Sequence, residues 1–446
     1  MRRVFRIAGW IMLGLVVAFV LAFAWGRLRP RPIEAREAMA LMHEDRRPPH
    51  EHEVWPLIWL YDVDVPVERM DAVYRDEVTY FNDTLATGKG QAFRLLESPA
   101  EKKFGVLPRV EASEMSLLCA PTERDCVAYA KENGDALAAI LQKHAERLRR
   151  MRLILAGDDA WNTMPVSPMM PLASGLNQRR LWLTDAALDF AQGRHTEGLG
   201  KACTDASGWR RLRRHTNSLL TSLIFASYAR QTGQLFSQML SDTPLDEVLP
   251  VECSDALAPP VEADVDLCVP MQAEFALMSA AMHTEEPGRS AWDRLTSWLA
   301  FNTAQYEADV AVHHSRFCRG AKSHGLLVGN ELTNPEDPAG ADIFEWVSNG
   351  AGNVLIKIAS PAYDDYARRM QDYAASLRMQ ATALWLRETR NNGRPLVERF
   401  AQRPVTMRID GADDIVLAAD GRSPSFTQRK PTSKQATGTI PLPAGL

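Results

Sequence analysis

The strongest feature of the hydrophobic pattern is an unbroken apolar run near the start of the chain. No charged side chain occurs from Ile7 to Trp25, and a helix needs about 20 apolar residues to cross the hydrocarbon core of a bilayer. Arginines flank the run on both sides, so charge alone gives little orientation. We predict a transmembrane helix over residues 7–25, with residues 1–6 in the cytoplasm.

A cleavable signal peptide is the alternative interpretation of this run. Ala22-Phe23-Ala24 has the small-x-small form that signal peptidase recognises. The run is longer than the usual apolar core of about 7–15 residues in a signal peptide, which favours a retained anchor. Both interpretations export the rest of the chain, so they differ only in whether it stays tethered.

Beyond the anchor, apolar residues recur at helical spacing along most of the chain. We assign residues 26–54 to a juxtamembrane linker and residues 55–402 to a helical domain. A second helix is predicted from Ser360 as the cap and Pro361 in the first turn, ending near Asn391. The clearest single stripe on one face of a predicted helix consists of Leu137, Leu141, His144, Leu148, Met151 and Leu155.

Two successive helical hairpins are predicted from residue 179 onwards. In each, an apolar helix ends in a glycine-containing turn, first at Gly193-Arg194 and then at Gly233-Gln234, and a second helix follows. The arrangement resembles tetratricopeptide-type helix pairs in general form, although its period of about 40 residues differs from the 34 of that family. The predicted fold class is therefore mainly α, with a layout like an α-solenoid.

The C-terminal part of the chain loses the helical pattern. A small β-hairpin is predicted within residues 403–420, with strands near Val405–Ile409 and Ile415–Ala418 around Asp410-Gly411. Residues 421–446 are rich in Pro, Ser, Thr and Gly, which is typical of a flexible tail.

Six cysteines in an exported chain predict disulfides in an oxidising compartment. We expect Cys119 to pair with Cys126 across a short polar turn, and Cys253 with Cys268, which leaves Cys203 and Cys318. The alternative is buried free thiols, because cysteine is also a common core residue. No spacing matches a zinc site. Disulfides outside the cytoplasm orient the anchor with its N-terminus inside.

The sequence carries no established catalytic motif, neither a nucleophile elbow nor a phosphate-binding loop nor a zinc-protease motif. The best candidate metal site is Asp309, His313 and His314, because Asp309 and His313 lie one helical turn apart. The simpler interpretation is a solvated helix face with one histidine against the core. We predict no cofactor.

Two arginine clusters could form a patch for lipid headgroups or an acidic partner if their helices pack side by side. The simpler interpretation is solvated helix faces and intramolecular ion pairs, since the chain has 56 acidic residues. The candidate residues are Arg149 and Arg150 on one predicted helix, and Arg210, Arg211, Arg213 and Arg214 on another.

Together these features predict a single-pass protein of a bacterial inner membrane with its C-terminal domain in the periplasm. The formal net charge of −5 argues against a nucleic-acid partner. We expect a non-enzymatic scaffold or binding protein, with an inhibitor or immunity-type protein as a variant. Its partners are the bilayer, through residues 7–25, and a protein or peptide. The alternative function is a periplasmic metal-dependent hydrolase that uses Asp309, His313 and His314.

Overall fold

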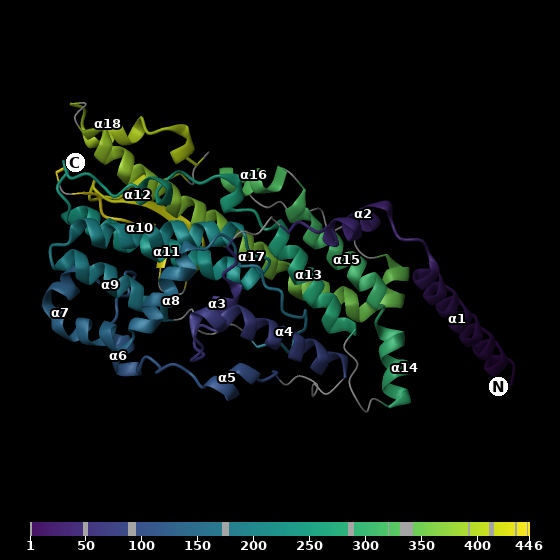
Figure 1. Ribbon diagram of the computed structural model, residues 1–446. Coiled ribbons are helices and arrows are strands. Elements are labelled where there is room, and N and C mark those ends of the chain that lie inside the picture. Colours follow the sequence, from purple (N-terminus) through teal and green to yellow (C-terminus); the bar gives the residue numbers. More distant parts are fainter. Residues whose placement is uncertain are drawn as a thin grey trace.

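The protein is mainly helical, with one small sheet near the C-terminus, as the sequence predicts (Figure 1). The fold is taken from a computed structural model. It describes residues 2–47, 52–87, 95–171, 178–283, 290–319, 321–330, 342–390, 393–409, 414–432, 435–443 and 445–446.

Helix α1 (Arg2–Leu28) carries the N-terminal apolar run and projects from one end of the domain (Figure 1). Within the described residues, its segment Phe5–Leu28 is the one helix that is long and apolar enough to cross a membrane. The side chains of residues 7–21 are exposed, as those of a lipid-facing helix would be. From Ala22 onwards the helix is partly buried against the domain.

Part of the segment assigned to a juxtamembrane linker belongs to the folded domain instead. Helix α2 (Ile33–Met42) buries Ala35, Ala38 and Met42, and packs against α15 (Thr303–Ser315). Only residues 29–32 separate α2 from the end of α1. The folded domain therefore begins almost directly after α1.

Short helices joined by irregular segments build the first part of the domain. Prolines lie in the first turns of α3 and α5, where they cost no hydrogen bond, and the Asp125 side chain caps α7. The predicted stripe from Leu137 to Leu155 faces the core, but His144 divides it between two helices. The helices are α3 (Trp55–Trp59), α4 (Met70–Ala86), α5 (Pro99–Phe104), α6 (Ala112–Leu117), α7 (Cys126–Lys143) and α8 (Ala145–Ala156), with a 3-10 turn η1 (Val67–Arg69) before α4.

The middle of the domain consists of long helices that pack on their neighbours in sequence. Gly193 adopts a positive φ of 84° in the turn between α9 (Arg180–Ala191) and α10 (His195–Arg214), so the first predicted hairpin is confirmed. The second is wrong, because α11 (Leu219–Asp242) runs through Gly233 without a turn. A Cβ at Gly233 would overlap the Gln380 side chain, so this glycine permits close helix packing. The short α12 (Glu252–Ala256) and the 3-10 turn η3 (Glu262–Asp264) follow.

Helix α17 (Ile343–Glu388) organises the second half of the domain, because it packs against α1, α11, α15 and the sheet. Its start is earlier than the predicted Ser360, because Asp342 and Glu345 form a capping box there. Its backbone departs from helical geometry at Asn349. The neighbouring elements are α13 (Cys268–His283), α14 (Ala291–Ala300), η4 (Arg316–Cys318), α16 (Ala321–Val328) and α18 (Leu396–Ala401).

The C-terminal β-structure is a three-stranded antiparallel sheet. Its first strand, Val416–Leu417, falls within the predicted strand Ile415–Ala418, whereas its other two strands lie in the segment predicted to be a flexible tail. The segment Val405–Met407 forms a 3-10 turn, η6, rather than a strand, and the predicted Asp410-Gly411 turn lies outside the described residues. Strand β1 (Val416–Leu417) pairs with β2 (Pro424–Thr432), which pairs with β3 (Gln435–Thr439). The sheet packs Phe426 and Ile440 against Ala375 and Met379 of α17, which orders much of the segment expected to be flexible.

All six cysteines form disulfides. Cys119 pairs with Cys126, as their spacing predicted. The predicted pair Cys253–Cys268 is wrong, because α12 packs along α10 and brings Cys253 to Cys203. Cys268, at the start of α13, joins Cys318 in η4. These bonds indicate an oxidising compartment.

Candidate functional sites

The three residues of the predicted metal site lie on α15 but do not converge. Asp309 and His313 share one face of the helix, whereas His314 turns into the core. The Nδ1 atom of His314 is 2.8 Å from the Val310 carbonyl oxygen, and its ring packs edge-on against Tyr363. Burial lowers the pKa of His314 to about 4, so the imidazole is neutral at pH 7.

Asp309, like His314, has a pKa that burial shifts toward the neutral form of the side chain. Burial, and in second place the negative charge of Glu345, raises its pKa to about 7. A carboxyl group of this kind titrates near neutral pH. Within the described parts of the chain, no three His, Cys, Asp or Glu side chains are placed to hold a metal ion.

The arginines on α8 do not contribute to a surface patch. Arg150 is buried, and its guanidinium donates to the carbonyl oxygens of Leu60, Tyr61, Val63 and Val65. Arg149 is exposed and pairs with Glu146 at 2.8 Å, three residues earlier. The two neighbours thus have different roles, since successive side chains of a helix point about 100° apart.

The arginines on α10 are also used inside the domain. Arg210 forms two hydrogen bonds with the Asp264 carboxylate, at 2.9 and 2.6 Å, and Arg214 adds a third at 2.7 Å. Burial acts to raise the pKa of Asp264, but these hydrogen bonds outweigh it and lower the pKa to about 2. Arg211 and Arg213 donate to backbone carbonyl oxygens instead. Arg210 and Arg213 are buried, whereas Arg214 is exposed and Arg211 is partly exposed. Contacts within the domain therefore occupy these arginines, and the anionic-partner patch stays a prediction.

A carboxyl pair that the sequence analysis missed lies where three irregular segments meet. The Glu53 side chain is hydrogen-bonded to Asp159, and its Oε1 atom accepts from the backbone N–H groups of Trp55 and Trp161, at 3.0 and 2.9 Å. Burial, with the neighbouring carboxyl group, raises the pKa of Glu53 to about 8. The pair therefore shares a proton at neutral pH. The two residues are far apart in sequence, so no local motif could have indicated the pair.

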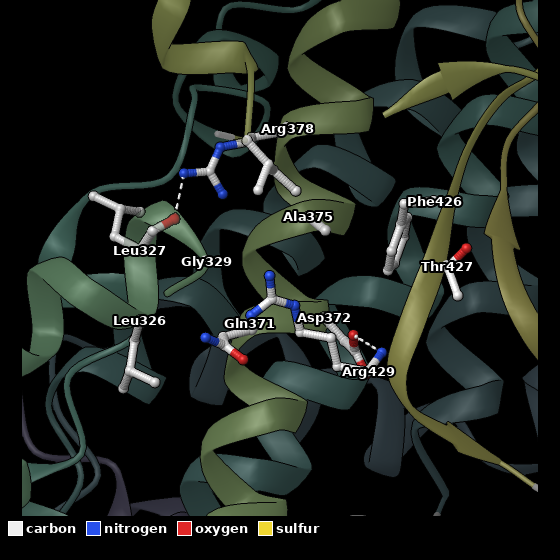
Figure 2. Close-up of a pocket in the computed structure, with 11 residues that line it drawn as sticks. Leu326, Leu327, Gly329, Gln371, Asp372, Ala375, Arg378, Phe426, Thr427 and Arg429 are labelled. Carbon is white, nitrogen blue, oxygen red and sulfur yellow. Dashed lines mark hydrogen bonds between the residues drawn. The ribbon is translucent and has the colours of Figure 1, made fainter. Parts of the chain in front are cut away.

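A small pocket lies between α16, α17 and strand β2 (Figure 2). Asp372 points toward β2, where it accepts from the backbone N–H groups of Arg429 and Lys430, at 2.8 and 3.0 Å. Arg378 donates to the Leu327 carbonyl on the other side (Figure 2). The volume of about 10 Å³ is that of a single water. This pocket is a packing feature of the sheet rather than a substrate site.

A scan against protein-family models and searches of curated proteins and of solved structures found no match to this chain.

Proposed function

We propose that this chain is a membrane-anchored scaffold or binding protein that holds a helical domain against the periplasmic face of a bacterial inner membrane. The apolar helix α1 supports anchoring. The three disulfides support an exported domain. Together they support an N-terminus in the cytoplasm and a domain outside it.

The observation that carries this proposal is the close junction between α1 and the domain. Gly26 lies so close to α17 that a Cβ there would be 2.4 Å from the Phe344 carbonyl oxygen. Arg29 forms ion pairs with Asp342 and Glu345 at the start of α17. Contacts of this kind fix the orientation of the domain relative to α1. A fixed orientation suits a protein whose role is to present a binding surface at a constant distance from the membrane.

The opposite end of the molecule offers a surface for a protein partner. Helix α18 lies at the end far from α1 (Figure 1). Arg387, in the last turn of α17, donates to the carbonyl oxygens of Pro244 and Glu247 and so holds the segment before α12 at this end. Both regions expose apolar side chains that a protein partner could cover on binding. They are Val248, Val251, Val397 and Val405.

In-cell photo-crosslinking tests the proposal. A photo-reactive amino acid at Val248 or Val397 should yield a protein adduct of the same added mass from both positions. Asp135, exposed on α7, is the control position and should yield none. The proposal fails if neither valine position yields an adduct, or if fusion of a periplasm-dependent reporter to the C-terminus shows no reporter activity.

A metal-dependent hydrolase remains the second candidate function. The observation in its favour is the Nε2 atom of His314, which is buried without a hydrogen-bond partner among the described residues, on the same helix as Asp309, whose pKa is about 7. Metal analysis of the purified full chain tests it. Stoichiometric zinc or manganese that is lost in His313→Ala would support the hydrolase, and a metal-free protein would reject it.

A further inference from the structure

Helix α14 is amphipathic, and its apolar face has no cover among the described residues. Trp292, Leu295 and Leu299 follow one another at helical spacing and are 69%, 45% and 43% exposed. The capping box of Ser290 and Asp293 fixes the start of the helix, and this polar cap lies away from the apolar stripe. A row of large exposed apolar side chains on a short surface helix is the pattern of an element that contacts an apolar phase.

The position of α14 is defined by its contacts with the end of the membrane anchor. The ring of Trp298 packs edge-on against Phe23, with centroids 5.4 Å apart. The Arg27 guanidinium lies over the Trp298 ring, 4.5 Å from its centroid. It also donates to the carbonyl oxygens of Trp298 and Phe301 at the C-terminal end of α14. Helices α1 and α14 extend from the same end of the domain (Figure 1).

These contacts set the depth of α14 relative to a bilayer. Phe23 belongs to the apolar run, and Arg27 is the first charged residue after it. At about 1.5 Å per residue, these two positions differ by about 6 Å along the helix axis. Trp298 touches both of them, so the C-terminal end of α14 lies at the boundary between hydrocarbon and headgroups, where tryptophan is enriched.

The start of α17 continues the same apolar surface. Ile343 and Trp346 are exposed there, directly beside the Gly26 contact with α1. The Lys357 ammonium lies 5.4 Å from the centre of the Trp346 ring. A lysine ammonium over the face of a tryptophan ring is a cation–π contact, and tryptophan is enriched at membrane interfaces.

We infer that α14 lies in the interfacial layer of the same leaflet from which α1 emerges, with Trp292, Leu295 and Leu299 directed toward the lipid acyl chains. The inference rests on α1 spanning the membrane, as in the proposed function. Asp293 and Arg294 balance the charge of α14. Its contact with lipid therefore depends on apolar burial rather than on attraction to anionic headgroups. With α1, it fixes the tilt of the domain.

Photo-crosslinking in liposomes of pure phosphatidylcholine tests this inference on the full chain. A diazirine amino acid at Leu295 should form adducts whose added mass is that of one phospholipid. The same probe at Arg294, turned about 100° around the helix, is the matched control and should give several-fold fewer lipid adducts. Both positions are exposed, so neither substitution disturbs the core.

A probe at Leu15, in the exposed part of α1, separates the possible failures. Lipid adducts at Leu15 without adducts at Leu295 would overturn the interfacial position of α14 alone. Absence of lipid adducts at Leu15 would overturn the anchor and with it the proposed function. An adduct at Leu295 with the mass of a second copy, or of another protein in native membranes, would mean that a protein covers α14, and would also overturn the inference.

Discussion

Arginine side chains hold much of the irregular backbone of this domain in place. Arg147 donates to the carbonyl oxygens of Leu107 and Pro108, and Arg399 to that of Leu386. Buried carbonyl groups outside helices and sheets need such donors. A planar guanidinium offers five N–H groups, which serve several carbonyls at once, whereas lysine offers a single ammonium. In this sequence arginine greatly outnumbers lysine, and the need for such donors gives a physical reason for that excess.

The substitution Arg210→Met tests this role. It keeps an unbranched stem but removes the guanidinium, and leaves the buried Asp264 carboxylate with Arg214 as its remaining charged partner. The carbonyl oxygens of Ala258 and Pro259 lose their donor as well. We expect a loss of about 3–5 kcal/mol in the free energy of unfolding, measured by chemical denaturation.

Arg149→Met is the matched control for this experiment. Arg149 has an ion pair too, with Glu146, but its side chain is 47% exposed. The expected loss is about 0–1 kcal/mol. Equal losses in the two variants would contradict the structural role of Arg210.

The positions of these arginines along the sequence indicate that they are buried, although the amino-acid composition alone does not. Arg147, Arg150 and Ile154 are spaced as one helix face, directly beside the apolar Met151. Their side chains therefore had to enter the core. What the sequence could not show is the set of acceptors, because Leu60 and Val65 become neighbours of Arg150 only in the folded chain. An arginine patch on a predicted helix is thus ambiguous until its partners are known.

The Glu53–Asp159 pair makes stability depend on pH. The pKa of Glu53 rises from an ordinary 4.5 to about 8 in the folded protein. Between these values the folded state keeps a proton that the unfolded state releases, so stability falls as pH rises toward 8. The Glu53 side chain is 23% exposed, and solvent screening reduces the effect to about 1–3 kcal/mol.

Glu53→Gln removes the titration and keeps an oxygen to accept from Trp55 and Trp161. We expect the melting temperature of the variant to change less between pH 5 and pH 9 than that of the parent protein. Thermal unfolding followed by circular dichroism is the measurement. The same slope with pH in both proteins would show that the pair does not bind the proton.

At the scale of elements, the disulfides differ in the length of the chain segment that each closes into a loop. Cys203–Cys253 closes a separation of 50 residues, whereas Cys119–Cys126 closes one of 7. Chain-entropy arguments give about 4 kcal/mol for the longer loop and about 2.5 kcal/mol for the shorter. Replacing the first pair by serines should therefore lower the denaturation midpoint more. A larger loss on replacing Cys119 and Cys126 would show that local strain or packing, rather than loop length, determines how much each disulfide stabilises the domain.

The elements that could be predicted from the sequence are those that depend on residues close to them in the chain. The hairpin of α9 and α10 follows from the turn at Gly193. Strand β2 was missed because its polar sequence, Pro424–Thr432, becomes a strand through contacts with α17 and not through its own alternation. Gly233 was misread for the same reason, since the partner that requires a glycine there is Gln380 on another helix.

At the scale of the whole molecule, the two ends of the domain have different surfaces. One end carries α1 and the apolar faces of α14 and α17, and the other exposes isolated valines around α18. Helix α17 runs between them as a 46-residue element that departs from helical geometry at Asn349. Its part after Asn349, residues 350–388, spans about 58 Å. A connection of this length would carry the orientation set at the start of α17 to the far surface.

The contact between α1 and α17 at Gly26 can be tested by substitution. Gly26→Leu would force its side chain against the Phe344 carbonyl and Ser348, at a cost of about 1–3 kcal/mol for overpacking. Separation of α1 from α17 would expose the Arg27–Leu28 bond, which trypsin cleaves when the backbone is accessible. We expect faster release of the domain from membranes by trypsin.

Gly14→Leu is the control for this last substitution, since a Cβ at Gly14 meets nothing within 4 Å. The same side chain is added to the same helix, but at an exposed position away from the domain. Trypsin should release this variant at the parent rate. If both variants behave like the parent protein, the domain moves freely on its anchor, and the fixed orientation on which the proposed scaffold role depends is lost. If Gly26→Leu alone is released faster, close packing at this one glycine holds the domain to the membrane.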